Sequence, residues 1–276
     1  MTIGSLFSGI GGLEIALESC GLGPVVWQCD SDPHARAVLA THWPNVRRYN
    51  DVREIDETAE CPDIICGGFP CQNISNAGKR EGISGPQSGL WSEFARIIRV
   101  LRPRVVFVEN VAALAARGLD RVLGDLATLG FDAEWDVLRA ADVGAPHLRA
   151  RLFILAHADG FNKWLQPWRG NGSRWSHQTV APHDGADRDV AHSDGIGERE
   201  QNDKAAAERD GRTWSRSDAC GRGWWAAEPD VGRVAHGVPD RAHRLRLLGN
   251  SVVPQQAAHA WLTLSARASR SQTEAA

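Results

Sequence analysis

The hexapeptide GGFPCQ occupies residues 67–72 and decides how the rest of the chain can be interpreted. It follows the apolar run Pro62–Cys66, which predicts a short buried strand. The chain therefore leaves a strand, passes two glycines and presents Cys71 at the carboxyl end of that strand, where open α/β sheets bind their ligands. Pro70 fixes its own backbone and restricts Phe69. We interpret Cys71 as a candidate nucleophile, against the alternative of a small core residue.

Composition limits the classes of function. The chain has 276 residues, enough for one large domain or one domain with a small second one. Its formal net charge of −3 excludes a generally basic nucleic-acid binder, so any contact with DNA must come from a local basic surface. The amino terminus carries no signal-peptide pattern and no apolar run approaches membrane-spanning length, so we expect a cytoplasmic protein without membrane contact.

The six cysteines fit reduced thiols better than a disulfide framework, because most of them fall in expected strands and helices. Cys61, Cys66 and Cys71 do not have the two-residue spacing of zinc sites, so we expect no metal centre. Cys66 also has the wrong spacing for a Cys-x-x-Cys pair with Cys71, which disfavours a thiol oxidoreductase.

A glycine-rich turn follows the first expected strand, Ile3–Phe7. Residues 8–12 read SGIGG and lead into a helix expected over Leu13–Ser19. Glycines at such a turn let the backbone approach a ligand at a helix amino terminus, although the same turn often only allows tight packing. Because the spacing is not Gly-x-Gly-x-x-Gly, a nicotinamide cofactor is disfavoured.

Asp30 directly follows a second expected strand, Val25–Cys29. It comes about twenty residues after the glycines, where a carboxylate can hold a ribose hydroxyl. The alternative is a cap for the helix expected over Pro33–Thr41, which has proline in its first turn. Asp32 is placed to share these two tasks with Asp30.

The stretch Gln72–Pro86 is long for a loop in a compact domain. Its glycines allow hinge motion, and we interpret it as a lid that closes over DNA, against the alternative of a passive loop. An amphipathic helix is expected over Ser88–Leu101, with its apolar stripe in the core. The candidate nucleic-acid contacts in the expected lid are Gln72, Ser75, Lys79 and Arg80.

Val105–Val108 is a continuous apolar run, which predicts a central strand covered on both faces. This strand delivers Glu109 to the edge of the sheet that carries Cys71. We interpret Glu109 as a carboxyl in a partly dry site, where its pKa would rise, rather than as a helix cap or a surface charge.

A helix is expected around Leu119–Leu129. Beyond it, Ala133–Leu138 and Arg151–Ala156 predict an antiparallel pair that closes the sheet. Arg149 lies just before the second strand of this pair, and Arg151 is the first residue of that strand. Two such arginines can be solvated, but beside a nucleotide site they suit phosphate and base-oxygen contacts.

Five stretches, in order, resemble the motifs of the DNA cytosine-5 methyltransferases. They are FSGIGG at residues 7–12, GFPCQ at 68–72, ENV at 109–111, RAR at 149–151 and GNSV at 249–252. The resemblance covers roughly residues 1–158 and 232–262. It departs from the family at His147, where the family usually has glutamine.

The resemblance implies an α/β fold with a doubly wound, Rossmann-like methyltransferase sheet. The catalytic domain would comprise residues 1–158 plus 232–276, and residues 159–231 would form a small, irregular target-recognition domain. The resemblance also implies S-adenosylmethionine as cofactor, with Asp30 on the ribose, Phe7 against the adenine and Asp51 on the adenine amino group. Further implied cofactor contacts are Gly9, Gly11, Gly12, Pro70, Leu90 and Asn250.

The implied reaction takes place on a cytosine flipped out of duplex DNA. Cys71 would add to carbon 6, and Glu109 would protonate or hydrogen-bond nitrogen 3. Arg151 would hold the ring oxygen, while Arg149 would support a phosphate or the lid. Carbon 5 would then accept the methyl group.

Residues 159–231 differ in character from the rest. They are rich in polar residues and glycine, yet six tryptophans fall here: Trp164, Trp168, Trp175, Trp214, Trp224 and Trp225. Interleaved basic and aromatic residues are typical of a nucleic-acid surface, and the alternative is a poorly ordered polar insertion.

The carboxyl-terminal part is expected to return to the sheet. Arg241–Leu248 is basic and apolar, and Gly249–Ser251 is expected to form a turn. A helix is expected over Gln255–Leu264, followed by a frayed tail, Ser265–Ala276. By resemblance, this last helix packs beside the first strand and completes the cofactor pocket.

The expected partner is double-stranded DNA, methylated by a monomer, and the resemblance allows a cognate restriction endonuclease as a second partner. Two alternatives stay open. The first is an RNA cytosine-5 methyltransferase, because a related branch with the same motifs acts on RNA. The second is a catalytically silent DNA-binding regulator, which the presence of Cys71, Glu109 and both arginines disfavours.

Overall fold

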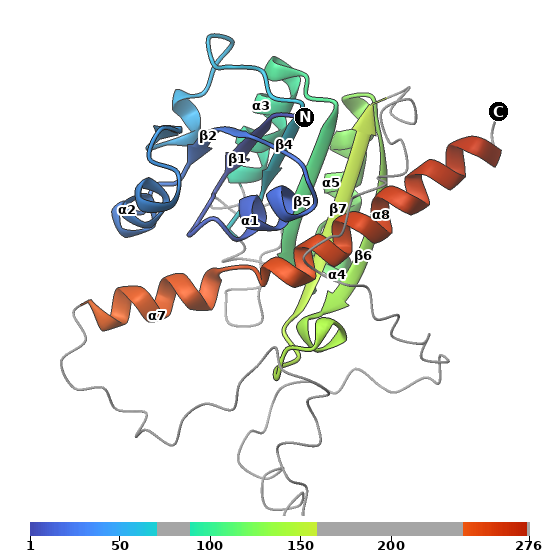
Figure 1. Cartoon of the computed structure of the whole chain (residues 1–276). Coiled ribbons are helices and arrows are strands. Elements are labelled where there is room, and N and C mark those ends of the chain that lie inside the picture. Colours follow the sequence, from blue (N-terminus) through green and yellow to red (C-terminus); the bar gives the residue numbers. More distant parts are fainter. Residues whose placement is uncertain (71–88, 159–239, 275–276) are drawn as a thin grey trace, which may run out of the picture.

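A computed structural model describes residues 1–70, 89–158 and 240–274 of the chain. These residues form one seven-stranded sheet in the order β3-β2-β1-β4-β5-β7-β6 (Figure 1). The strands are β1 (Ile3–Leu6), β2 (Val25–Cys29), β3 (Arg47–Tyr49), β4 (Ile64–Gly67), β5 (Val105–Val111), β6 (Phe131–Arg139) and β7 (Ala150–Ala158).

Helices connect the strands and cover the sheet. They are α1 (Gly12–Ser19), α2 (Pro33–His42), α3 (Gly89–Leu101), α4 (Leu114–Arg117), α5 (Leu119–Thr128), α7 (Arg241–Asn250) and α8 (Pro254–Glu274), with short 3-10 turns η1 (Val52–Glu54) and η4 (Ala140–Val143).

The strand order reverses direction beside β1. The chain runs outward from β1 to β2 and β3, then returns to β4 and β5 on the other side, with parallel pairing throughout this part. β7 inserts between β5 and β6 and is antiparallel to both. Such a reversal point is where open α/β sheets bind ligands, at the carboxyl ends of the strands. The expected doubly wound α/β fold is therefore confirmed.

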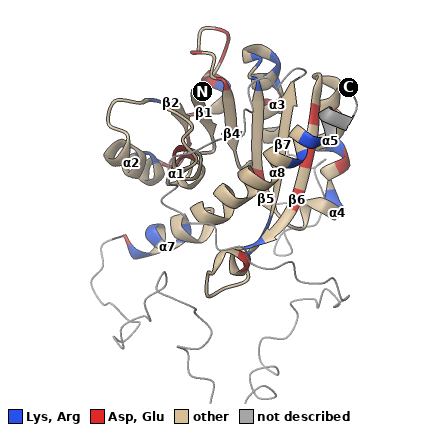
Figure 2. Cartoon of the chain, turned by 45° about the vertical axis from the view of Figure 1, so that its right-hand side comes forward, with Lys and Arg blue, Asp and Glu red and all other residues tan. Residues whose placement is uncertain are grey.

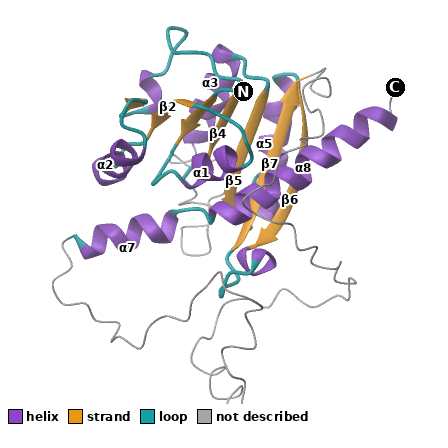
Figure 3. Cartoon of the chain, viewed as in Figure 1, coloured by secondary structure: helices purple, strands orange, loops and turns teal. Residues whose placement is uncertain are grey.

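Helices cover both faces of the sheet (Figure 3). An apolar layer lies between each face and its helices. One core cluster joins one face of the sheet to α3 and α5, through side chains such as Phe94, Ile98 and Val122. The other joins the opposite face to α1 and α8, through side chains such as Leu17 and Trp261. β5 is buried on both faces because it lies inside both layers, as its continuous apolar sequence predicts.

Most strand predictions agree with the structure. Val25–Cys29 forms β2, and the expected antiparallel pair forms β6 and β7, each longer than predicted. β5 continues through Glu109 to Val111, because those residues pair with β7. Glu109 is therefore a strand residue, not one that follows the strand.

Two predictions for the carboxyl-terminal part are wrong. The tail Ser265–Ala276 was expected to fray, but α8 continues to Glu274, because Ala268 still packs in the core and Arg267 pairs with Asp136 at 2.6 Å. Gly249 and Asn250 were expected in a turn, but they form the last residues of α7. None of the helices in the described part of the chain combines the length and apolar character that crossing a membrane requires.

Candidate active site

Glu109 and Arg151 form an ion pair at the carboxyl end of the central strands. Arg151 Nε lies 2.9 Å from Glu109 Oε1, and the two side chains are only 18% and 14% exposed, respectively. In the β5–β7 ladder Glu109 lies opposite Phe153, and Val111 lies opposite Arg151. Because side chains two residues apart on a strand share a face, the ladder places Glu109 and Arg151 on the same face of the sheet.

The protonation state of Glu109 follows from its surroundings. Burial raises the pKa of its carboxyl, and the nearby Arg151 and Arg149 offset part of this rise. Glu109 is thus held closer to its acid form than a surface glutamate, while Arg151 stabilises the anion that remains after proton transfer. The pair can therefore give a proton to a ring nitrogen and take it back.

The segment after β4 lies directly against Glu109. A β-carbon on Gly68 would come within 2.8 Å of Glu109 Oε2, so only glycine fits there without displacement. Asn110 donates its side-chain N–H to the carbonyl of Phe69 at 3.2 Å. The Phe69 ring packs on Trp91 with their centroids 5.2 Å apart. The chain is therefore fixed to β5 and α3 just before the exposed Pro70.

Five predicted site residues lie outside the described residues: Cys71, Gln72, Ser75, Lys79 and Arg80. The same holds for the expected target-recognition region, residues 159–231. Among the described residues, the structure brings together Glu109, Arg151 and the segment 68–70 that immediately precedes Cys71 in the chain.

Arg149 points to the turn between α7 and α8. Its Nη2 donates to the carbonyl of Gly249 at 2.8 Å and also to that of Ser251. Its backbone has φ of 37°, in the left-handed region. Partial burial lowers the pKa of its guanidinium, and the nearby Arg151 adds to this effect. In the structure Arg149 therefore supports the carboxyl-terminal turn.

Gln256 strengthens the same connection. Its side-chain N–H group donates to the carbonyls of Leu138 at 2.8 Å and of Arg149 at 3.0 Å. One buried amide thus ties the β6–β7 hairpin to the start of α8. This connection joins the end of the sheet that holds Arg151 to the start of α8, just after the end of α7 at Asn250.

The glycine turn occupies the carboxyl end of β1. Gly9 and Gly11 have φ of 55° and 88°, conformations that favour glycine. A β-carbon on Gly12 would lie 2.7 Å from Val252 Cγ1, so this glycine allows the turn to pack against the residues before α8. The Gly9 N–H donates to Asp30 Oδ2 at 2.7 Å, which joins the ends of β1 and β2.

Asp32, rather than Asp30, performs the expected capping task. Asp32 caps α2 by accepting from the backbone N–H of His34 at 2.9 Å, and it also pairs with Arg246 at 2.5 Å. Asp30 does not cap the helix. Its two carboxylate oxygens each accept one backbone N–H, from Gly9 and from Asp32. Each oxygen keeps a second lone pair for a hydroxyl, and burial raises the pKa of this carboxyl.

The other expected cofactor residues surround the same edge. Phe7 has φ of 54° and stacks on Phe94, with their ring centroids 6.4 Å apart. Asp51 begins η1 by accepting the Arg53 N–H at 2.9 Å. Leu90 is half-buried near the start of α3, and Asn250 is exposed at the end of α7. Asp51 Oδ2 also pairs with Arg53 Nη1 at 3.3 Å. A glycine turn, the Asp30 carboxylate and an aromatic ring at one edge suit a nucleoside with a charged tail.

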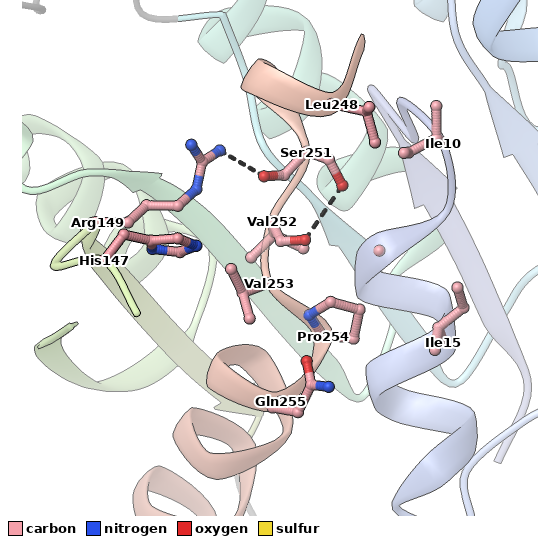
Figure 4. Close-up of a pocket in the computed structure, with 11 residues that line it drawn as sticks. Ile10, Ile15, His147, Arg149, Leu248, Ser251, Val252, Val253, Pro254 and Gln255 are labelled. Carbon is pink, nitrogen blue, oxygen red and sulfur yellow. Dashed lines mark hydrogen bonds between the residues drawn. The ribbon is translucent and has the colours of Figure 1, made fainter. Parts of the chain in front are cut away.

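A cavity of about 420 Å³ lies on the other side of the glycine turn (Figure 4). Its walls are the start of α1, the turn before α8, and the loop that carries His147 and Arg149. Of the nine expected cofactor residues, Gly12 lines this cavity and the other eight do not. We therefore do not identify this cavity with the nucleoside site.

α7 carries a local positive charge below the same edge of the sheet (Figure 2). It contains Arg241, Arg244 and Arg246 and no acidic residue, in a chain of net charge −3. The helix rests on α2 through the Asp32–Arg246 ion pair and through His34 and His243, whose rings stack 4.2 Å apart. This is a local basic surface of the kind that contact with DNA requires.

Sequence reasoning missed several buried polar residues that support the site. Glu14 on α1, Gln28 on β2 and Gln256 on α8 are fully buried. A polar residue within an apolar pattern could have indicated two of them. Glu14 adjoins the apolar stripe of α1, and Gln28 interrupts an apolar strand. In the described part of the chain, no cluster of three His, Cys, Asp or Glu residues is placed to hold a metal.

Comparison with known proteins gives the chain a family context. The sequence model of the C-5 cytosine-specific DNA methylases matches residues 1–214. The type II methyltransferase M2.BsuMI of Bacillus subtilis is 35% identical over 164 residues, which cover 56% of this chain and 42% of that protein. M.HhaI of Haemophilus parahaemolyticus is 34% identical over 162 residues, which cover 57% of this chain and 49% of that protein. The matched part thus spans less than half of each relative.

Solved structures agree on the fold. The structure of Spodoptera frugiperda DNMT2 superimposes with a TM-score of 0.50 at 22% identity, covering 62% of this chain and 52% of that one. The Entamoeba histolytica methyltransferase EhMeth superimposes with a TM-score of 0.52 at 20% identity, covering 58% and 54%. At these identities the likeness concerns the fold alone.

Proposed function

The chain belongs to the family of C-5 cytosine-specific DNA methylases, and on that premise we propose that it methylates carbon 5 of cytosine in double-stranded DNA. The methyl donor is S-adenosylmethionine. The observation that carries this proposal is the Glu109–Arg151 ion pair against Gly68, three residues before Cys71. An acid beside a fixed cation, next to a nucleophile, is what addition to a cytosine ring needs.

The first step is addition of the Cys71 thiolate to carbon 6 of a cytosine that has left the base stack. A sulfur–carbon bond forms, and the electrons of the carbon 5–carbon 6 double bond move toward nitrogen 3. Glu109 gives its proton to nitrogen 3, which keeps the new electron density in the ring without a free charge. Arg151 hydrogen-bonds the ring oxygen and holds the Glu109 carboxylate that remains.

S-adenosylmethionine supplies the electrophilic methyl group that carbon 5 receives. Asp30 is suited to the ribose hydroxyls, Phe7 to the adenine face and Asp51 to the adenine amino group. The backbone at Gly9 and Gly11 leaves room for the charged tail of this cofactor. After methylation, solvent water takes the proton from carbon 5, and its C–H electrons re-form the carbon 5–carbon 6 double bond. The sulfur–carbon bond breaks as Cys71 leaves as thiolate, and nitrogen 3 returns its proton to Glu109.

We infer target recognition for residues 159–231, whose tryptophans and arginines suit contacts with bases and phosphates. The Arg149 and Gln256 contacts would then hold the turn through which this region rejoins the catalytic domain. We further propose a monomer that works in the cytoplasm, with a restriction endonuclease of the same specificity as its partner enzyme.

A covalent trap tests this mechanism. Fluorine at carbon 5 cannot leave as a cation, so a duplex with 5-fluorocytosine at the target should hold the protein covalently when S-adenosylmethionine is present. The target is first located by bisulfite sequencing of DNA from cells that express the protein. Mass spectrometry should then map the adduct to Cys71, and Cys71→Ser should abolish it, because an alcohol is a poor nucleophile without an adjacent base.

Each alternative gives a different result. A silent regulator would bind the fluorinated duplex without forming an adduct. An RNA methyltransferase would trap the RNA version and leave the DNA free. An adduct at Cys66 instead of Cys71 would overturn the assignment of the nucleophile.

A further inference from the structure

A polar cluster is buried behind the glycine turn, between α1 and the first strands. Glu14 on α1, Gln28 on β2 and Ser5 on β1 are all fully buried. The side-chain N–H of Gln28 donates to Glu14 Oε1 at 3.3 Å. An ionised carboxylate in such a place is strongly disfavoured unless a cation or several donors compensate it. None of the ion pairs among the described residues includes Glu14.

Two oxygens of this cluster lack a hydrogen-bond partner among the described residues: Glu14 Oε2 and Gln28 Oε1. A single proton shared between these two atoms would give each of them a hydrogen bond. A carboxylic acid and a primary amide can make two hydrogen bonds at once, an N–H donated to the acid carbonyl and an O–H donated to the amide carbonyl. The first of these bonds is present, and a proton on Glu14 Oε2 would supply the second. Buried polar atoms rarely stay unpaired, so the arrangement favours the protonated acid.

We propose that Glu14 is a neutral carboxylic acid joined to the Gln28 amide in this cyclic pair, and that the pair positions the glycine turn for the cofactor. Glu14 lies two residues after Gly12. The role proposed for it involves no contact with the cofactor, so Glu14 is a positioning residue. The second half of the proposal rests on the proposed use of S-adenosylmethionine, and the first half does not.

Ser8 provides the connection between the pair and the turn. Its hydroxyl donates to Ser5 Oγ at 2.9 Å and accepts the Cys29 N–H at 3.3 Å. Its own N–H donates to the Cys29 carbonyl at 3.0 Å. Ser8 thus fixes the turn to β1 and β2, directly before Gly9, whose N–H holds Asp30.

Ionisation of Glu14 would disturb this arrangement. A carboxylate only accepts hydrogen bonds, so it would lose the O–H bond to Gln28 and attract other donors. The hydroxyls of Ser5 and Ser8 are such donors, and both favour the charged form of Glu14. Turning the Ser8 hydroxyl toward Glu14 would break its bond to Ser5 and shift the residue before Gly9.

The surroundings of Glu14 agree with a neutral acid at moderate pH. Burial raises the pKa of Glu14 from its ordinary value of 4.5 to about 7. The titratable group that faces it from β4 is Cys66, whose thiol pKa burial and Glu14 both raise. Glu18 lies one turn further along α1, and Asp30 follows β2. The turn before α8 and α8 itself meet α1 through Val252 and Ala258, which carry no charge.

Infrared difference spectroscopy tests the pair without reference to activity. The protein and its Glu14→Gln variant are compared at pH 6, so that every other carboxyl cancels. Glutamine keeps both hydrogen bonds as an amide–amide pair, so we expect the variant to fold. The difference should show the carbonyl stretch of one protonated carboxylic acid, which converts to carboxylate bands as the pH rises through 7.

Calorimetric binding of S-adenosylmethionine tests the positioning role. The ratio of the dissociation constants of the unaltered protein and Glu14→Gln is measured from pH 6.5 to 8.5, which cancels the titration of the cofactor and of other residues. Above the Glu14 pKa of about 7, one linked proton weakens binding by up to tenfold per pH unit. We therefore expect the ratio to rise by up to about twentyfold over this range.

The outcomes separate the parts of the proposal. Carboxylate bands at pH 6 would mean an ionised Glu14 bridged to Gln28 by water, and would overturn the pair. Failure of Glu14→Gln to fold would also contradict it, because the amide–amide pair preserves both bonds. A constant ratio with the acid band present would overturn the positioning role. No binding by either protein would overturn the proposed cofactor and leave the infrared result standing.

Discussion

Two glutamates, one partly buried and one fully buried, differ in their partners. Glu109 lies on β5, paired at 2.9 Å with Arg151. Glu14 lies on α1, hydrogen-bonded at 3.3 Å to the neutral amide of Gln28. Burial raises the pKa of both carboxyls. Loss of hydration alone therefore does not distinguish a reacting group from a supporting one.

Glu109 and Glu14 differ in the charge of the partner side chain and in the exposure of the carboxyl group. Glu109 has a cation that stabilises its charged form, and glycine at position 68 leaves space against its second oxygen. It can therefore lose and regain a proton within one reaction. Glu14 has a neutral amide and no exposed surface, so it is suited to keep its proton.

The largest expected effect is the dependence of folding stability on Glu14. Its folded pKa of about 7 exceeds the ordinary 4.5, so between these values the folded state holds a proton that the unfolded state has lost. The free energy of unfolding should therefore fall by roughly 3 kcal/mol as pH rises from 4.5 to 7, and stay level above 7. Urea unfolding of the protein and of Glu14→Gln across this range measures the effect. Parallel profiles for both proteins would contradict it.

Glu109→Gln should slow covalent trapping by 5-fluorocytosine DNA by about a hundredfold, the usual scale for a general acid. The variant keeps the shape of the side chain and loses only the proton. Rapid-quench electrophoresis of the adduct gives the rate, and the exposed Glu57→Gln serves as the matched control. Trapping at an unchanged rate would mean that Glu109 only orients Arg151.

Asp30→Ala removes the carboxylate expected on the ribose. A hydrogen bond to a charged group contributes about 1.5–3 kcal/mol, so affinity for S-adenosylmethionine should fall by roughly ten- to a hundredfold. Asp32, which caps α2, is unaffected, so the fold should persist. Calorimetry measures the affinity, and circular dichroism checks the fold. Unchanged affinity would limit Asp30 to joining β1 and β2.

Gly68→Ala should have the smallest effect of the four on the site. The added carbon would lie 2.8 Å from Glu109 Oε2, and overpacking of this kind costs about 1–3 kcal/mol of stability. Gly124→Ala in α5 is the control, because nothing lies within 4 Å of its added carbon. It should stabilise the helix by up to about 1 kcal/mol. Thermal unfolding measures the stability of both variants. Equal shifts of the unfolding temperature would show that the segment 68–70 can move away from Glu109.

A large share of the sheet could be predicted from the sequence. Val25–Cys29 and Val105–Val108 are apolar runs bounded by polar or glycine residues, and such runs have few alternatives to a buried strand. β3 was not predicted, because Arg47–Tyr49 is short and polar and becomes a strand only by pairing with β2. The length of α8 was also underestimated, because its second half is stabilised by contacts with β6.

The candidate site, like the sheet, could be predicted from the sequence only in part. The sequence by itself determined which chemical groups are available, because motifs of glycine, acid and arginine stand beside strand ends that must meet at one edge of the sheet. The tertiary structure decided how these groups are used. Only strand pairing set Arg151 against Glu109, only the turn before α8 engaged Arg149, and only the packing of α1 on β2 buried Glu14 with Gln28. Periodicity places a residue on a face, whereas its partner comes from a distant part of the chain, and the partner sets the charge that the residue carries.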